Sequence, residues 1–145
     1  MRVMALDFGT KAIGVALSDE LQLTARPLTT LRRDRLKFAE VMSQIADLVT
    51  EHAAGTLVVG LPLNMDGTRG PATSRVESFI AELRRHVVIP IHTIDERLTS
   101  YEAEQALRAS GAKLRERRAK SDEYAAVLIL QDYLAAHSGN LRTTP

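Results

Sequence analysis

Several acidic residues stand directly after apolar segments or at the start of a helical one, where their carboxylates could be brought together. They are Asp7, Asp66, Asp95, Glu96 and Asp122. In open α/β sheets the carboxyl ends of the parallel strands meet at one edge, and functional groups collect there. Asp122 joins this edge by helix geometry, because Ala126, Ile129 and Tyr133 follow it at offsets of four, seven and eleven on one face. We therefore expect a cluster of carboxylates at this edge.

Carboxylates that converge in this way repel one another unless a divalent cation neutralises them. The chain has no cysteine, and its four histidines lack ligand spacing. Oxygen ligands alone favour Mg²⁺ or Mn²⁺, and the matching chemistry is phosphoryl transfer in which two ions activate water and stabilise the leaving oxygen. Each acid also has a structural alternative, because Asp7 could cap the turn at Gly9 and Asp122 could cap a helix.

Basic side chains gather between residues 108 and 120, next to the predicted acid cluster. This segment holds one acid, Glu116, against Arg108, Lys113, Arg115, Arg117, Arg118 and Lys120. It is either a solvated loop or an arm that neutralises the phosphates of a polyanion. The residues that we expect to contact nucleic acid are Lys11, Asn64, Arg69, Arg97, Arg115, Arg117, Arg118 and Lys120. Because aromatic residues make up only 4% of the chain, recognition of backbone or shape is favoured over stacking on single-stranded bases.

Length and composition suit one globular domain. The chain has 145 residues, 45% of them apolar, and a formal net charge of +1. We expect a single domain over residues 1–138 and a flexible tail over residues 139–145. Without cysteine there is no disulfide and no thiolate zinc site. No apolar run has membrane length and no signal peptide is evident, so we expect a cytoplasmic protein with no membrane partner.

Hydrophobic periodicity predicts a mixed α/β sheet of five strands, three antiparallel and then two parallel, with helices on both faces. The expected strands are residues 2–7, 13–18, 22–31, 56–60 and 87–94, and the expected helices are residues 34–55, 71–83, 99–109 and 121–136. In the helix that Pro71 opens, we expect a buried stripe of Ala72, Val76, Phe79, Ile80 and Leu83. Glu123 is expected to face solvent, because it is rotated away from the stripe that contains Asp122.

Four segments resemble the motifs of the YqgF family, also called RuvX-like. They are DFGTKAIGVA at residues 7–16, VGLPLNMDGT at 59–68, DERLTS at 95–100 and KSDEYAA at 120–126. The resemblance spans nearly the whole chain and implies an RNase H-like fold. Family members are described as nucleases that mature the 5′ end of pre-16S ribosomal RNA, and some as Holliday junction resolvases. By position, the resemblance makes Asp7, Glu96 and Asp122 the catalytic metal ligands, with Asp95 and Asp66 as additional candidates.

The leading hypothesis is a metal-dependent endonuclease that acts on structured RNA during ribosome biogenesis, with two Mg²⁺ or Mn²⁺ ions. Its partners would be structured RNA or branched DNA and a ribosome precursor, and it would be a monomer or a homodimer. A Holliday junction resolvase is the nearest alternative, and it needs a symmetric dimer to present two active sites. A noncatalytic RNA-binding assembly partner is a third. An ATP-binding actin-like domain also opens with an Asp-x-Gly-Thr turn, but such proteins pair two domains around the nucleotide.

Overall fold

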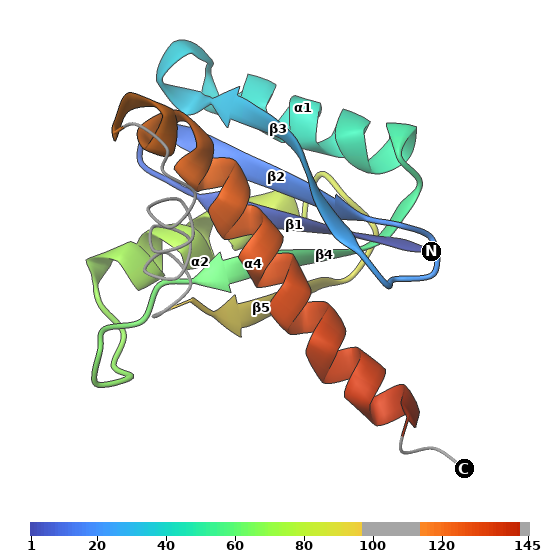
Figure 1. The fold of residues 1–145 in the computed structure, drawn as a ribbon. Helices are drawn as coiled ribbons and strands as arrows, with labels where there is room; N and C mark the ends of the chain where they lie inside the picture. The colour runs from blue at the N-terminus through green and yellow to red at the C-terminus, as the bar shows by residue number, and fades with distance from the viewer. Residues whose placement is uncertain (97–113, 143–145) are drawn as a thin grey trace.

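The computed structural model describes the backbone of residues 1–96 and 114–142, and the side chains of residues 1–96 and 123–137. A five-stranded mixed sheet has the strand order β3-β2-β1-β4-β5 (Figure 1). Its first three strands form an antiparallel meander, and its last two run parallel to β1. The strands are β1 (Arg2–Phe8), β2 (Ala12–Ser18), β3 (Ala25–Arg32), β4 (Ala54–Leu61) and β5 (Ile91–Asp95). The predicted α/β architecture is confirmed.

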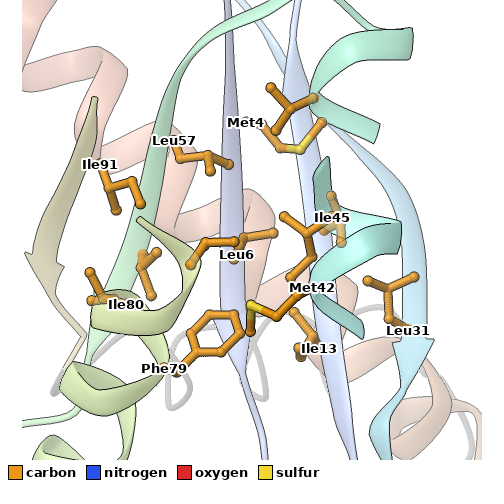
Figure 2. Packing of buried hydrophobic residues seen from close by; sticks show 14 of the residues in the cluster. Met4, Leu6, Ile13, Leu31, Met42, Ile45, Leu57, Phe79, Ile80 and Ile91 are labelled. Carbon is orange, nitrogen blue, oxygen red and sulfur yellow. The ribbon is translucent and has the colours of Figure 1, made fainter. Parts of the chain in front are cut away.

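Helices cover both faces of this sheet (Figure 1). The helices α1 (Phe38–Glu51) and α2 (Pro71–Leu83) pack on one face, and α4 (Leu114–Arg142) packs on the other. Strand alternation divides β1 between the two layers, with Met4 and Leu6 facing α1 and α2 and with Val3 and Ala5 facing α4. Figure 2 shows the first layer, where Leu6 meets Met42, Ile45, Phe79 and Ile80. Because both faces are covered, the four β1 residues between Arg2 and Asp7 are all apolar.

Strand register determines which residues stand beside Asp7. Asp7 pairs with Gly14 on β2, and Gly14 pairs with Thr30 on β3. On the other side, the parallel ladder reaches Leu6 and Val59, so the next residue of β4, Gly60, lies beside Asp7. Asp7 therefore has a glycine on each neighbouring strand, and no side chain from either strand crowds its carboxylate.

The first helix is shorter than predicted. A short 3-10 helix, η1 (Arg33–Arg35), precedes it, and α1 itself runs from Phe38 to Glu51. The predicted end near Gly55 was wrong, because β4 already pairs with β1 from Ala54 onward. Ala53 takes the left-handed conformation that reverses the chain, with φ of 52°.

The last strand is also shorter than the predicted residues 87–94, since β5 begins at Ile91. Pro90 has no N–H to donate to a ladder, although its carbonyl accepts a hydrogen bond from the Leu57 N–H at 2.9 Å. Before Pro90 the chain is not paired in the sheet, and Val88 is fully exposed.

The last helix is longer than predicted, and the basic segment before Ser121 is helical instead of irregular. The helix α4 begins at Leu114 and ends at Arg142, beyond the predicted end at Ala136. Arg, Lys, Glu and Ala are strong helix formers, so this segment needs no apolar stripe to be helical. The helix predicted over residues 99–109 lies outside the described residues, and the domain boundary at residue 138 stays a prediction. In the described ranges, no helix combines the length and the apolar character that crossing a bilayer requires.

Candidate active site at the carboxyl edge of the sheet

Glu96 directly follows β5 and is buried, with only 9% of its surface exposed. Its backbone N–H donates to the Leu61 carbonyl at 3.2 Å, which continues the β4 to β5 ladder by one residue. Its Oε2 atom is buried and has no hydrogen-bond partner among the described atoms. A carboxylate oxygen buried without a partner is costly, and an ion or water bound at this site would offset that cost.

Asp7 and Glu96 come together at this edge, as predicted. Burial, the charge of Asp7, a hydrogen bond with Asp7 and the charge of Asp95 together raise the pKa of Glu96 from 4.5 to about 8. Burial is the largest of these causes, because the charged form loses its water. The raised pKa favours the protonated form of Glu96 near neutral pH, and a bound cation would favour its ionised form.

Gly60 makes room for this arrangement. A Cβ atom added at Gly60 would lie 2.5 Å from Glu96 Oε2 and 2.6 Å from Ile129 Cδ1. Glu96 and α4 thus both occupy the space that any other residue at position 60 would need. This explains the glycine, since its backbone shows no positive φ that would require one.

We expect Gly60→Ala to lower the free energy of unfolding by about 1–3 kcal/mol, because the methyl group overpacks a filled space. Gly55→Ala is the comparison variant in the same strand and should cost less, because the three atoms nearest to its added Cβ all belong to the side chain of the N-terminal Met1, which is 75% exposed. Urea unfolding of both variants would measure the difference. Equal stability of the two variants would contradict the packing described at Gly60.

The packing of α4 on the sheet indicates where its residue Asp122 lies. The helix buries Ala126, Ile129 and Tyr133 against the sheet, which confirms the predicted inward face. The expectation that Glu123 faces solvent was wrong, because its carboxylate is half-buried and accepts a hydrogen bond from Thr30 Oγ1 at 3.0 Å. Thr30 belongs to the same cross-strand row as Asp7. The Glu123 side chain therefore reaches the row of residues that contains Asp7, while the role of the Asp122 side chain stays a prediction.

Asp66 is exposed and takes part in a turn of the loop between β4 and α2. Its Oδ1 accepts hydrogen bonds from the Thr68 N–H at 3.0 Å and the Thr68 hydroxyl at 2.6 Å. Asn64 belongs to the same turn, because its side-chain amide donates to Thr68 Oγ1 at 2.9 Å. Arg69 forms an ion pair with Glu77 of α2. The loop therefore has a structural use for these residues, and metal or nucleic-acid binding by them remains a prediction.

The other predicted nucleic-acid contacts are distributed around the same edge. Lys11 is exposed in the turn between β1 and β2, two residues beyond Gly9. The backbone positions of Arg115, Arg117, Arg118 and Lys120 lie in the first two turns of α4, which starts on the side of the sheet toward which β4 and β5 point (Figure 1). Arg97 lies outside the described residues.

Thr73 was not predicted from the sequence. The predicted buried stripe of α2 included Ala72, whereas Thr73 is fully buried and Ala72 is half-buried. The Thr73 hydroxyl donates to the Pro62 carbonyl at 2.5 Å and accepts from the Gly70 N–H at 3.2 Å. It thereby ties the loop after β4 to the first turn of α2. A threonine three residues after the N-cap Gly70 was the available signal.

The acid pair fits a hard divalent cation. It offers carboxylate oxygens only, becomes doubly negative when both groups ionise, and includes a buried oxygen with no hydrogen-bond partner among the described residues. Among the residues whose side chains are described, no three acids or histidines lie close enough together to hold an ion. A third protein ligand would therefore come from a side chain outside the described set, and Asp122 is the predicted one.

The mixed sheet, its strand order and its helices on both faces define an RNase H-like domain of the RuvC type. Thermus thermophilus RuvC, solved with a Holliday junction substrate, superposes with a TM-score of 0.63 at 14% identity, covering 96% of this chain and 97% of that one. The fowlpox virus resolvase, solved with Holliday junction DNA, gives a TM-score of 0.56 at 13% identity, covering 94% and 98%. At such identities the likeness concerns the fold alone.

The chain belongs to the RuvX family, whose profile, described as Holliday junction resolvase, matches residues 1–136. A relative from Halalkalibacterium halodurans is 48% identical over 134 residues, which covers 92% of this chain and 96% of the relative. One from Moorella thermoacetica is 46% identical over 134 residues, covering 92% and 94%. Both carry the name "Putative pre-16S rRNA nuclease". The predicted family and fold are confirmed.

Proposed function

We propose that this chain is a metal-dependent endonuclease that hydrolyses a phosphodiester bond at the 5′ end of pre-16S ribosomal RNA. The observation that carries the proposal is the pair of half-buried Asp7 and buried Glu96, whose Oε2 atom has no hydrogen-bond partner among the described residues. A buried acid beside a second acid that disfavours its charge has no structural advantage over a neutral residue, but such a pair suits a metal site. The substrate is proposed from the name that the relatives carry.

In this proposal Asp7, Glu96 and Asp122 hold Mg²⁺ or Mn²⁺, with Asp95 beside them. One or two such ions, when bound, would neutralise phosphate charge and make water a stronger nucleophile. The chain itself supplies rigid placement, since Asp7 is fixed in the central strand and Glu96 is held between β4 and α4. Lys11 and the basic first turns of α4 would draw the phosphate backbone to this edge.

The partners follow from the same chemistry. We propose structured RNA within a ribosome precursor as the substrate, met in the cytoplasm by a monomer or a homodimer. The basic residues of α4, which are Arg115, Arg117, Arg118 and Lys120, would contact phosphates and not bases.

The experiment is cleavage of a pre-16S transcript and a four-way DNA junction side by side, with and without Mn²⁺. We expect the wild type to cut the transcript only with metal, and Asp122→Asn to lose at least about a hundredfold in rate, because a charged ligand is removed without a change of shape. Asp132→Asn, a change of an exposed acid further along α4, serves as the matched control. Binding without metal-dependent cleavage of either substrate would contradict the proposal.

Junction resolution is the second candidate, because the matching family is described by that activity. It requires two active sites on opposing strands and hence a symmetric dimer. Cleavage of the four-way junction with intact transcript, by a protein that sediments as a dimer, would select it over RNA processing.

A further inference from the structure

A pocket of about 440 Å³ lies on the α1 and α2 side of the sheet, beside the carboxyl end of β1. Its lining combines aromatic rings, two arginines, and the hydroxyl groups of Ser74 and Ser78 on α2. All three phenylalanines of the chain, Phe8, Phe38 and Phe79, line it. A pocket of this volume suits a small ligand or one unit of a polymer, not a double helix.

One of the arginines is held in a fixed stack. The Arg33 guanidinium lies 4.0 Å from the centroid of the Phe8 ring, and Phe8 in turn stacks on Phe79 with 4.3 Å between centroids. Arg33 Nη1 also donates to the Gly9 carbonyl at 2.5 Å. Phe8 contacts one face of the guanidinium plane, and a planar guanidinium can carry a base on its second face. Phe38, which is 49% exposed, offers another flat apolar surface.

The pocket carries positive charge that its lining does not neutralise. Within the described residues, neither Arg33 nor Arg75 forms an ion pair. Burial and the nearby charge of Arg75 lower the pKa of Arg33, as expected for two cations that face one space. Glu82 lines the pocket, but its carboxylate lies 3.8 Å from Arg85 and 3.5 Å from His86. An anionic group would relieve this repulsion.

We propose that the pocket binds one unpaired nucleotide of the RNA substrate, with the base stacked on Arg33 or Phe38 and a phosphate held by Arg75. The identity of the ligand rests on the proposed function. Phe8 directly follows Asp7 in β1, and successive side chains of a strand point to opposite faces. A single strand that crosses this edge would therefore reach the acid pair on one face and the pocket on the other. Proteins recognise single-stranded RNA by stacking its bases on flat side chains and by contacting its phosphates with arginines.

The test measures binding of a fluorescein-labelled single-stranded RNA hexamer to the full chain in EDTA, where cleavage cannot interfere. Phe38→Ala and Arg75→Gln change exposed side chains and should not disturb the core. We expect each to raise the Kd by about five- to a hundredfold, as removing a stacking or phosphate contact does. Arg26→Gln, an equal change of charge at an exposed position of β3 away from the pocket, should change the Kd by less than about twofold.

Unchanged binding by Phe38→Ala and Arg75→Gln would overturn the proposal. So would displacement of the RNA by AMP at a lower concentration than by unlabelled hexamer, which would indicate a site for a free mononucleotide. Equal displacement by inorganic phosphate would indicate a simple anion site.

Cleavage kinetics with Mn²⁺ separate this inference from the nuclease function. If both variants cleave RNA with the same KM as the wild type, the proposed pocket is refuted and the nuclease function is not. If both variants bind RNA more weakly but the wild type cleaves no RNA, the nuclease function is refuted and the pocket is not.

Discussion

Asp7→Asn is expected to reduce metal-dependent RNA cleavage by at least about a thousandfold, which corresponds to roughly 4 kcal/mol of transition-state stabilisation. Asparagine keeps the shape of the side chain and the strand register, but it removes the charge on which the proposed metal site depends. The folded protein should survive, because the change also relieves the repulsion between Asp7 and Glu96. Unfolding in EDTA should therefore show a stability equal to or greater than that of the wild type.

The matched control is Asp47→Asn, which removes an exposed carboxylate from α1. Its cleavage rate should stay within about twofold of the wild type. Mn²⁺ should raise the melting temperature of the wild type and of Asp47→Asn, but not that of Asp7→Asn. Wild-type cleavage rates in Asp7→Asn would show that the carboxylate pair is not the catalytic centre.

The stability of the metal-free protein is expected to fall as pH rises from about 5 to above 8. The pKa of Glu96 is raised from 4.5 to about 8 in the folded protein, so between these values the folded state holds a proton that the unfolded chain releases. The contribution of this group to stability is therefore complete below pH 4.5 and is lost as pH rises through about 8. Each pKa unit corresponds to about 1.4 kcal/mol, so the total loss is on the order of several kcal/mol.

Denaturant unfolding in EDTA at pH 5 to 8.5 would measure this loss in the wild type and in Glu96→Gln. Glutamine cannot titrate, so the difference between the two proteins isolates Glu96 from every other group. The charges that face Glu96 are Asp7 on β1 and Asp95 at the end of β5, and they remain in both proteins. Parallel pH profiles would show that Glu96 does not hold a shifted proton. Added Mn²⁺ should stabilise the wild type most at high pH, where both carboxylates are ionised.

The fold was predictable because its signals are local. Continuous apolar runs predict β1 and β4 as strands, and an amphipathic stripe predicts α1 as a helix. Short connections between the first three strands imply an antiparallel meander. Element ends were less predictable, because they depend on partners. The first helix ends before the predicted Gly55 and Ala53 reverses the chain, because β4 pairs with β1 from Ala54, and no property of the segment alone reveals that register.

The candidate acid site was also predictable from the sequence only in part. Residue types, strand ends and helix geometry indicated that Asp7, Glu96 and Asp122 could meet, and the motif pattern selected these three as the metal ligands. The sequence did not reveal why Glu96 can be buried, which depends on the missing Cβ of Gly60 on β4. It also did not place Glu123, whose contact with Thr30 joins residues 93 positions apart.

The sequence by itself determined the class of fold, the family and the acids of the candidate site, because apolar periodicity and motif residues are local properties of the chain. Only the tertiary structure decided how those acids affect one another and where the phenylalanines gather. Burial, nearby charge and the hydrogen bond with Asp7 together raise the pKa of Glu96, and all three depend on atoms brought together from distant segments. For the same reason, Phe8, Phe38 and Phe79 form one pocket with Arg33 and Arg75 although nothing in their spacing indicates it.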